Sequence, residues 1–295
     1  MVVQKRKDNL PPNGLRNKGN TCFFNSAMQC ILSIGELNTF YKNTDFPRDK
    51  PISNAFKQFI AEYETPGCHD PKSFIDKLSG RIKLFNGMQQ DSHEFLIQFI
   101  DLLHNESDGN KSRLESKDEF EEVRKHSLVA KTLFSMDKQV LTCEACNYSS
   151  VTIAMNSTIL VEPYETVQLG IDRYYEEVKL EGKDAWRCDK CGRKESSRKR
   201  MEVLVHPDVL IVHISRFHPQ GWKNTASVEV NDTLLFNNRK YSLLGVVCQN
   251  GTLNGGHYFA EAKRSGTWNV YNDEQVTKGS RTYSGSHPYI AFYTL

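Results

Sequence analysis

Three segments in the first half of the chain carry apolar residues at the spacing of a helix. They are CFFNSAMQCIL, PKSFIDKLSGRIKLF and DSHEFLIQFIDLLH, which begin at Cys22, Pro71 and Asp91. Asn20 and Thr21 are good helix caps before the first segment, and Pro71 suits the first turn of the second. The third segment brings an apolar stripe to one face, made of Phe95, Phe99 and Leu102 or Leu103. Each segment therefore predicts a helix.

The second half of the chain is typical of strands, with short apolar segments rich in β-branched and aromatic residues. These segments are QVLTC, VTIAMNSTILV, VLIVHISRF, YSLLGVVCQ, HYFAEAKR, WNVYND and YIAFY. Helices up to about residue 136 and strands after it predict an α+β domain with a cleft where the two parts meet. Between them, the polar stretch 105–125 predicts an exposed excursion from the core.

Composition and charge narrow the class of protein. The chain has 295 residues, enough for one large domain or two small ones, and 38% of them are hydrophobic. A formal net charge of +2 gives no general attraction to nucleic acid or membrane. No apolar run approaches the roughly 20 residues of a membrane span, and the first residues, MVVQKRKDNLPPNG, lack the apolar stretch of a secretory signal.

Cysteine usage indicates the compartment. The chain contains eight cysteines, and four of them form two CxxC pairs. Without a secretory signal, such pairs bind metal more often than they form disulfides. We therefore expect the cytosol or the nucleus, and the short KRK at residues 5–7 does not decide between them.

Cys22 is a candidate nucleophile because it lies at the predicted start of a helix. Free backbone N–H groups and the helix dipole favour a thiolate there, and the same groups lie close to where an oxyanion would form. Asn17 carries a side-chain amide that could complete the oxyanion hole. For a cysteine alone, a buried structural role is the alternative, and this is the role that we expect for Cys30.

His257 is the candidate base. A thiol nucleophile needs a group that can later protonate the leaving amine, and histidine suits this near neutral pH. Among nine histidines, His257 stands out because Gly255 and Gly256 precede it and the apolar strand HYFAEA follows. Glycines there allow another backbone to approach closely, as a narrow substrate channel requires. A structural histidine at a strand start is the alternative.

A third group must hold the imidazole in the correct tautomer. The strand WNVYND follows the turn KRSGT and runs back beside the histidine strand, ending at Asn272 and Asp273. A hairpin brings its far end next to His257, so either side chain could orient the ring. The alternative is a polar turn after an edge strand.

Four cysteines form a candidate metal site. Cys143 and Cys146 lie in LTCEACNYSS, and Cys188 and Cys191 lie in WRCDKCGRKE. Four thiolates suit tetrahedral zinc, closed to water and therefore structural. The gap between the pairs is longer than in compact zinc ribbons. Redox thiols are the alternative.

Several segments together resemble ubiquitin-specific proteases. GLRNKGNTCFFNS and NGGHYFAEAK are similar to the cysteine and histidine boxes of that family, and NGMQQDSHEF is similar to its glutamine-aspartate box. VLIVHISRF resembles a further strand of the family. The resemblance runs from about residue 13 to 294. It implies a deubiquitinase, a cysteine-type ubiquitinyl hydrolase that cleaves the (iso)peptide bond after the C-terminal glycine of ubiquitin through an acyl-enzyme on Cys22.

The resemblance also implies residue roles. Cys22 would be the nucleophile, His257 the base and Asn17 the oxyanion donor. Asn272 would be the third member of the triad in preference to Asp273, which would be a supporting acid. The tail of ubiquitin is basic and ends in two glycines, so an acidic residue and a tight channel fit it. The implied substrate-binding residues are Gln89, Gln90, Asp91, Gly255, Gly256 and Tyr258.

The resemblance implies a papain-like cysteine protease fold of the ubiquitin-specific protease type. This α+β fold has a helical subdomain and a β-rich subdomain with a finger insertion, in which Cys143, Cys146, Cys188 and Cys191 hold a structural zinc. We expect a tail over 1–12 and a catalytic domain over 13–295, with helical, finger-like and β-rich parts over 13–136, 137–203 and 204–295.

Three other functions come into question, and two of them remain open on the sequence. One is a ubiquitin-binding module with weak or no catalysis, and another is a peptidase for a ubiquitin-like modifier. The balanced charge disfavours the third, a zinc-dependent nucleic-acid binder. The expected partners are ubiquitin and ubiquitinated proteins, with neither membrane nor nucleic acid.

Overall fold

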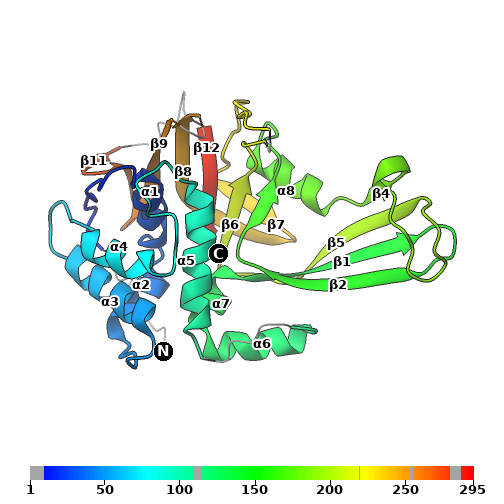
Figure 1. Ribbon diagram of the computed structural model, residues 1–295, viewed down its shortest axis with the longest axis horizontal. Helices are drawn as coiled ribbons and strands as arrows, with labels where there is room; N and C mark the ends of the chain where they lie inside the picture. Colours follow the sequence, from blue (N-terminus) through cyan, green and yellow to red (C-terminus); the bar gives the residue numbers. More distant parts are fainter. Residues whose placement is uncertain (1–9, 109–113, 219, 253–254, 280–286) are drawn as a thin grey trace.

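The computed structural model describes residues 10–108, 114–218, 220–252, 255–279 and 287–295. Its first part is helical and lies on the left of Figure 1. The helices are, in chain order, α1 (Cys22–Ile31), α2 (Gly35–Asn43), α3 (Pro51–Tyr63), α4 (Lys72–Ser79), α5 (Ser92–Asn105), α6 (Lys117–His126) and α7 (Leu128–Leu133). Aromatic rings fill the space between them, with neighbouring ring centroids 4.7 to 6.4 Å apart, and the set includes Phe24, Phe56, Phe59, Phe74, Phe95 and Phe99.

A large sheet stands beside the helices at the centre of the molecule (Figure 1). Its strands run in the order β11-β10-β9-β8-β12-β6-β3, and β7 pairs with β8 outside this path. They are β3 (Ile159–Val161), β6 (Val209–Ile214), β7 (Thr233–Phe236), β8 (Arg239–Gly251), β9 (Gly256–Arg264), β10 (Thr267–Asn272), β11 (Gln275–Lys278) and β12 (His287–Thr294). Neighbouring strands are antiparallel, except that β3 is parallel to β6.

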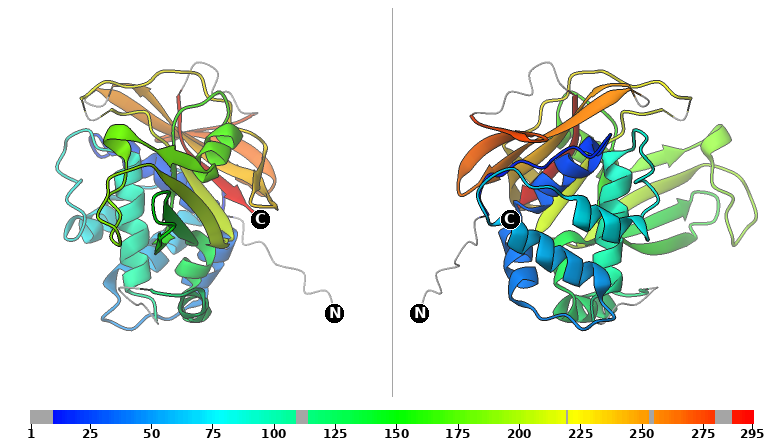
Figure 2. Two further views of the ribbon diagram at one scale, coloured as in Figure 1. Left: turned by 90° about the vertical axis from the view of Figure 1, so that its right-hand side faces the viewer. Right: turned by 60° about the vertical axis from the view of Figure 1, so that its left-hand side comes forward.

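A second, four-stranded sheet extends away from the helices, to the right in Figure 1 and toward the viewer in the left panel of Figure 2. Its order is β2-β1-β5-β4, and its strands are β1 (Ser135–Cys143), β2 (Ser149–Asn156), β4 (Val178–Leu180) and β5 (Ser197–Val205). Helix α8 (Val167–Tyr175) and a 3-10 turn, Gly182–Asp184, lie in the connections between them. This sheet carries both CxxC pairs.

Helix α1 is wedged between the helical part and the large sheet, and all of its residues are buried. It contacts β8, β9 and α5. The contact with β8 is close because Gly245 has no side chain, and a Cβ there would lie 3.0 Å from Cys30 Sγ. Because α1 is buried on all sides, it is held by both the helical part and the large sheet. Its first residue, Cys22, therefore faces the start of β9.

Arg264 at the end of β9 is a buried link between the two parts. Its Nη2 donates to Gln29 O at 3.0 Å and Gln29 Oε1 at 2.6 Å, and its Nη1 donates to Tyr63 OH at 2.6 Å. Gln29 lies seven residues after Cys22 on α1, and Arg264 lies seven residues after His257 on β9. The Cys22–His257 and Gln29–Arg264 contacts therefore join α1 and β9 at both ends. The guanidinium also lies over the rings of Tyr63 and Tyr271.

The structure confirms the α+β class and the three helices expected from periodicity, with some changes. The second helix ends at Ser79, because Gly80 follows as its C-cap and the chain turns there. The expectation of a wholly exposed excursion over 105–125 is wrong, because α6 forms from Lys117, is capped by Ser116, and buries Phe120 and Val123. The segment VTIAMNSTILV is divided into β2 and β3. Within the described part of the chain, no helix has the length and apolar character needed to cross a membrane.

Candidate active site and metal site

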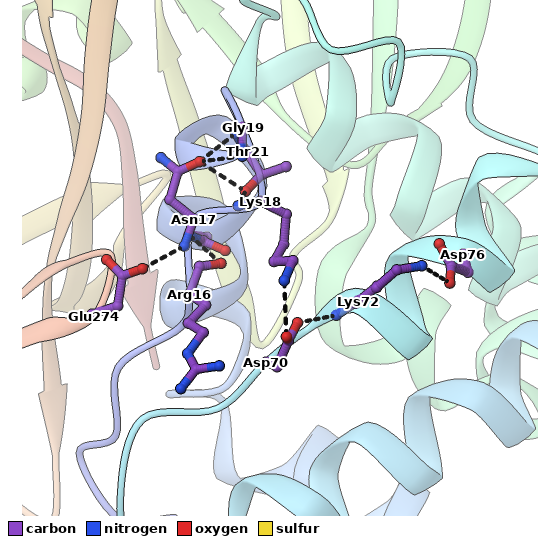
Figure 3. A network of polar contacts seen from close by, with 10 residues as sticks. Arg16, Asn17, Lys18, Gly19, Thr21, Asp70, Lys72, Asp76 and Glu274 are labelled. Carbon is purple, nitrogen blue, oxygen red and sulfur yellow. Dashed lines mark hydrogen bonds and ion pairs between the residues drawn. The ribbon is translucent and has the colours of Figure 1, made fainter.

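Cys22 is the first residue of α1 and has only 2% of its surface exposed. The loop before it turns sharply, with positive φ at Gly19 and Asn20. Asn17 Oδ1 holds this loop by accepting from the backbone N–H of Gly19 at 3.0 Å and of Thr21 at 3.1 Å (Figure 3). Thr21 does not cap the helix with its side chain; its hydroxyl accepts from Lys18 N instead.

His257 is the second residue of β9 and is bonded on both sides. Its Nε2 lies 2.6 Å from Asn272 Oδ1, at the end of β10. A hydrogen bond with Cys22 raises the pKa of His257 to about 9. Burial opposes this rise, whereas the bond with Asn272 and the nearby Asp273 carboxylate add to it. The imidazolium form is therefore favoured between the thiol and the amide.

Asp273 follows Asn272 with a positive φ of 52° and turns away from the imidazole. Its Oδ2 accepts from Asn17 Nδ2 at 2.9 Å and its Oδ1 accepts from Asn25 Nδ2 at 2.7 Å. Glu274 Oε1 accepts a further hydrogen bond from the backbone N–H of Asn17 at 3.0 Å (Figure 3). The turn after β10 therefore holds the loop before Cys22, while Asn272 holds His257.

A second set of charges runs from Lys18 of the same loop to the first turns of α4 (Figure 3). Lys18 Nζ is 2.9 Å from Asp70 Oδ2, and Lys72 Nζ is 2.6 Å from Asp76 Oδ2. The hydrogen bond from Lys18 lowers the pKa of Asp70. All four side chains are well exposed, so these pairs contribute little to stability.

Of the expected substrate-binding residues from the glutamine-aspartate box, Gln89 contacts the loop before Cys22. Gln89 Nε2 donates to Asn20 Oδ1 at 2.9 Å, and Gln90 Nε2 donates to Asn86 Oδ1 at 2.9 Å. Asp91 is the N-cap of α5, since its Oδ1 accepts from His93 N and Glu94 N at 2.7 and 3.0 Å. Its Oδ2 accepts from the hydroxyl of Tyr289. Asp91 is thus fully engaged within the chain.

The other expected substrate-binding residues surround His257. Gly255 and Gly256 end the turn between β8 and β9, and a Cβ on Gly256 would lie 2.7 Å from Asn250 O. At Gly256 the backbone is packed too closely for any other residue, whereas a Cβ on Gly255 would make only an ordinary contact with Thr252. Tyr258 is buried, with its ring centroid 5.8 Å from that of Tyr289. It therefore belongs to the packed wall behind the site.

Asn25 was not expected as a site residue, although it lies within the cysteine box, GLRNKGNTCFFNS. It is 3% exposed, on α1 one turn after Cys22. A polar side chain on a wholly buried helix requires a buried partner. A polar residue within the apolar helix segment CFFNSAMQCIL was therefore a signal in the sequence. Its partner could not be found from the sequence, because Asp273 is 248 residues away.

The four cysteines of the CxxC pairs meet at the end of the four-stranded sheet, with their sulfurs within 4.8 Å of one another. Cys143 Sγ is 3.9 Å from Cys191 Sγ, and Cys146 Sγ is 3.7 Å from Cys188 Sγ. In a tetrahedral zinc site with Zn–S bonds of about 2.3 Å, the sulfurs lie about 3.8 Å apart. The cluster therefore fits a closed metal site.

The two CxxC loops have the same backbone geometry. Asn147 N donates to Cys143 O at 2.9 Å, and Gly192 N donates to Cys188 O at 2.9 Å. Both Asn147 and Gly192 have positive φ, which asparagine and glycine tolerate best. This repeated turn aims both pairs of sulfurs at a common point.

An α+β fold with a thiol at a helix start, beside a histidine held by an asparagine, has the arrangement of the papain-like class. A family model described as ubiquitin carboxyl-terminal hydrolase matches residues 13–293, and the chain belongs to this family. The family resemblance expected from the sequence is thereby confirmed.

Individual relatives agree with this assignment. The chain is 28% identical to ubiquitin carboxyl-terminal hydrolase 25 of Arabidopsis thaliana, over 100% of this chain and 49% of the relative. It is 28% identical to ubiquitin carboxyl-terminal hydrolase 21 of Homo sapiens, over 96% of this chain and 61% of the relative. The chain thus spans about half to three-fifths of the length of these curated relatives.

A solved structure confirms the fold. The SAGA DUB module bound to monoubiquitin contains a chain that superposes with a TM-score of 0.75 at 22% identity, covering 99% of this chain and 72% of that one. The expected ubiquitin-specific protease fold is therefore correct, with a helical part, a β-sheet part and a four-cysteine cluster.

Proposed function

We propose that this chain is a thiol-dependent deubiquitinase, which hydrolyses the bond after the C-terminal glycine of ubiquitin. The observation that carries the proposal is the contact series from Cys22 to His257 to Asn272, with 2.6 Å between the last two side chains. Membership of the ubiquitin carboxyl-terminal hydrolase family and the similarity to a chain from a module bound to monoubiquitin support ubiquitin as the substrate.

In the first chemical step, the Cys22 thiolate attacks the carbonyl carbon of the terminal glycine. The C=O π electrons move to oxygen and form an oxyanion. His257 carries the proton because its pKa is raised to about 9, chiefly by the hydrogen bond with Cys22. When the oxyanion collapses, the C–N bond breaks and the imidazolium gives its proton to the leaving amine.

In this proposal, Asn17 stabilises the oxyanion together with backbone N–H groups at the start of α1. One of its two amide hydrogens goes to Asp273, and the other finds no acceptor among the described residues. Because Asn17 Oδ1 accepts from two backbone N–H groups, the amide cannot rotate freely. An amide fixed in advance stabilises developing charge without a cost of reorganisation.

The second step releases ubiquitin. His257, now neutral, takes a proton from water as the water oxygen attacks the thioester carbon. The C–S bond breaks, ubiquitin leaves with a terminal carboxylic acid that loses its proton to solvent, and the thiolate–imidazolium pair is restored. Asn272 accepts from Nε2–H throughout, so that the other ring nitrogen stays directed at Cys22.

The substrate tail is proposed to enter between the Gln89–Asp91 segment and the Gly255–Gly256 turn. Gln89 is bonded to the loop that carries Cys22, and the turn leads directly into His257. Because Gly255 and Gly256 carry no side chains, their backbone would allow the close approach of a tail that ends in two glycines. Asp91 caps α5 and holds Tyr289, so we infer that it shapes this entrance.

We further propose that Cys143, Cys146, Cys188 and Cys191 hold one structural Zn2+. The sulfur separations of 3.7 and 3.9 Å match a tetrahedral site. The ion would lock the end of the four-stranded sheet and take no part in the reaction. A thiol nucleophile and a zinc-thiolate site both require a reducing environment, so we place the protein in the cytosol or nucleus.

The first experiment measures release of a fluorescent amine from the C-terminus of ubiquitin. Wild-type protein should turn over, and Cys22→Ala should abolish turnover. Cys68→Ala is the matched control, because Cys68 is exposed and lies outside the site, and it should retain activity. Ubiquitin binding without turnover in the wild type would instead favour a binding module. Turnover of a ubiquitin-like modifier but not of ubiquitin would change the assigned substrate.

A further inference from the structure

Arg264 ends β9, and its guanidinium binds the helix that carries Cys22. The side chain is buried. Beside its two bonds to Gln29 on α1, its Nε donates to Ser33 Oγ at 3.3 Å, in the turn that follows this helix. One side chain of β9 therefore holds both the C-terminal half of α1 and the turn after it.

The same guanidinium binds the segment before α1 and the end of α3. Its Nη1 donates to Pro11 O at 3.0 Å as well as to the hydroxyl of Tyr63. That hydroxyl donates to Gln29 Oε1 at 2.9 Å, and Gln29 Nε2 donates to Asn13 O at 2.9 Å. A rotation or a slide of α1 along β9 would therefore break several of these bonds at once.

Arg264 also contacts the strand that carries Asn272. Its Cζ lies 4.8 Å from the ring centroid of Tyr271, the residue before Asn272 on β10. Strand β10 pairs with β9 from Thr267, opposite Arg264, to Tyr271. The side chains of the proposed triad stand on α1, β9 and β10. Arg264 is part of one of these elements and contacts the other two.

This anchor lies at the far end of α1 and β9 from the reacting groups. The contact between Cys22 and His257 is by itself one point of attachment, about which the helix could turn. The Arg264–Gln29 bonds supply a second point, and two points fix the helix on the strand. The alignment matters because a displacement of about 1 Å can cost about a hundredfold in rate.

We propose that Arg264 is a positioning residue, which holds α1 against β9 and β10 so that Cys22 and His257 stay aligned. This inference rests on the proposed function for its link to the turnover of ubiquitin. Arg264 acts through Gln29, and none of its described contacts is with Cys22 or His257.

The first test replaces Arg264 by lysine, which keeps a cation on a long stem but loses the planar fork. One ammonium cannot reproduce the bonds to Gln29 and Tyr63 together, so α1 should gain freedom at this end. The hydrogen bond with Cys22 is the chief cause of the raised pKa of His257, about 9, so a looser contact should lower this pKa. We expect a fall of about 1 pH unit in an NMR titration of the imidazole, with His257→Ala to assign the signal.

The same variant should divide the kinetic constants in a defined way. For the fluorescent ubiquitin amine, the kcat of Arg264→Lys should fall about tenfold or more, because the thiol and the imidazole no longer meet in the productive geometry. The KM should stay near the wild-type value, because the proposed tail-binding residues are not among the contacts of Arg264.

Arg216→Lys is the matched control, because Arg216 is also a buried arginine that binds neutral acceptors. It is 1% exposed. Its side chain donates to three backbone carbonyls outside α1, β9 and β10, those of Pro288, Asn224 and Ala226. Both variants should lower the Tm, whereas only Arg264→Lys should lower kcat and the pKa of His257.

A milder variant tests the same anchor if Arg264→Lys folds poorly. Tyr63→Phe keeps the ring beside the guanidinium and removes only the hydroxyl, which accepts from Arg264 and donates to Gln29 Oε1. The pKa of His257 should fall in this variant too, by less than in Arg264→Lys. An unmoved pKa in a folded Tyr63→Phe protein, with no folded lysine variant to set against it, would overturn the inference.

Three results with the arginine variants would also overturn it. An unchanged pKa of His257 in Arg264→Lys would leave Arg264 a structural residue, and an equal fall of this pKa in Arg216→Lys would show that any damage to the core disturbs the site. A lowered pKa with an unchanged kcat would show that the alignment does not limit the reaction. The titration needs no ubiquitin, so a wild-type protein that fails to cleave ubiquitin would refute the proposed function and leave the alignment test intact.

Discussion

Replacing Asn272 by alanine is the most direct test of how His257 is oriented. The substitution removes a 2.6 Å hydrogen bond between Asn272 Oδ1 and His257 Nε2. Hydrogen bonds to charged groups contribute about 1.5 to 3 kcal/mol, and the lower end applies because the imidazole is half-exposed and water can replace the amide. About 1.5 kcal/mol corresponds to a loss of about tenfold in kcat/KM. Rotation of the unrestrained ring away from Cys22 would add to this loss.

The same variant should change the pH profile in a defined direction. The pKa of His257 is raised to about 9, first by the hydrogen bond with Cys22 and further by the bond with Asn272. Removing Asn272 lowers this pKa, so the imidazolium loses its proton at a lower pH. The alkaline limb of kcat/KM for the fluorescent ubiquitin amine should therefore move toward neutral pH.

A matched control separates this effect from the loss of any buried asparagine. Asn269 lies on the same strand, is 4% exposed, and bonds only locally in the described contacts, from Nδ2 to Thr267 O at 3.2 Å. Asn269→Ala should lower stability while leaving the position of the alkaline limb unchanged. An Asn272→Ala enzyme with wild-type kcat/KM and an unmoved alkaline limb would refute the proposed role of Asn272.

Three other outcomes follow from the geometry. Asp273→Ala frees the side-chain amides of Asn17 and Asn25, and should reduce kcat/KM less than Asn272→Ala, with little shift of the alkaline limb. A larger loss for Asp273→Ala than for Asn272→Ala would exchange the roles of the two residues. Metal analysis should find about one zinc per chain, and Cys188→Ser should lower both the zinc content and the Tm. A metal-free protein with an unchanged Tm would contradict the zinc proposal. Burial lowers the pKa values of His93 and His213, whose rings stack on each other. Protonating these rings therefore costs the folded protein more than the unfolded chain. Their contribution to the free energy of unfolding should be present above about pH 6.5 and lost as the pH falls below it. Urea unfolding at pH 5 and 7 checks this, and equal midpoints would exclude it.

The sequence by itself determined the local parts of this protein. Apolar spacing and the absence of glycine and proline specified the helix that begins at Cys22. The two CxxC pairs, each followed by a residue that tolerates positive φ, specified a pair of turns suited to one metal. These features depend on residues close together in the chain, so the pattern alone reveals them.

The tertiary structure decided which distant groups meet. From the sequence, both Asn272 and Asp273 were candidate neighbours of His257. The strand register and the turn at Asp273 place the Asn272 amide against His257 and the Asp273 carboxylate against the Asn17 loop. Likewise, no local pattern pairs Arg264 with Gln29. Such contacts depend on how two sheets and a buried helix pack together, because a side chain can bond only to the acceptors that packing brings within about 3 Å.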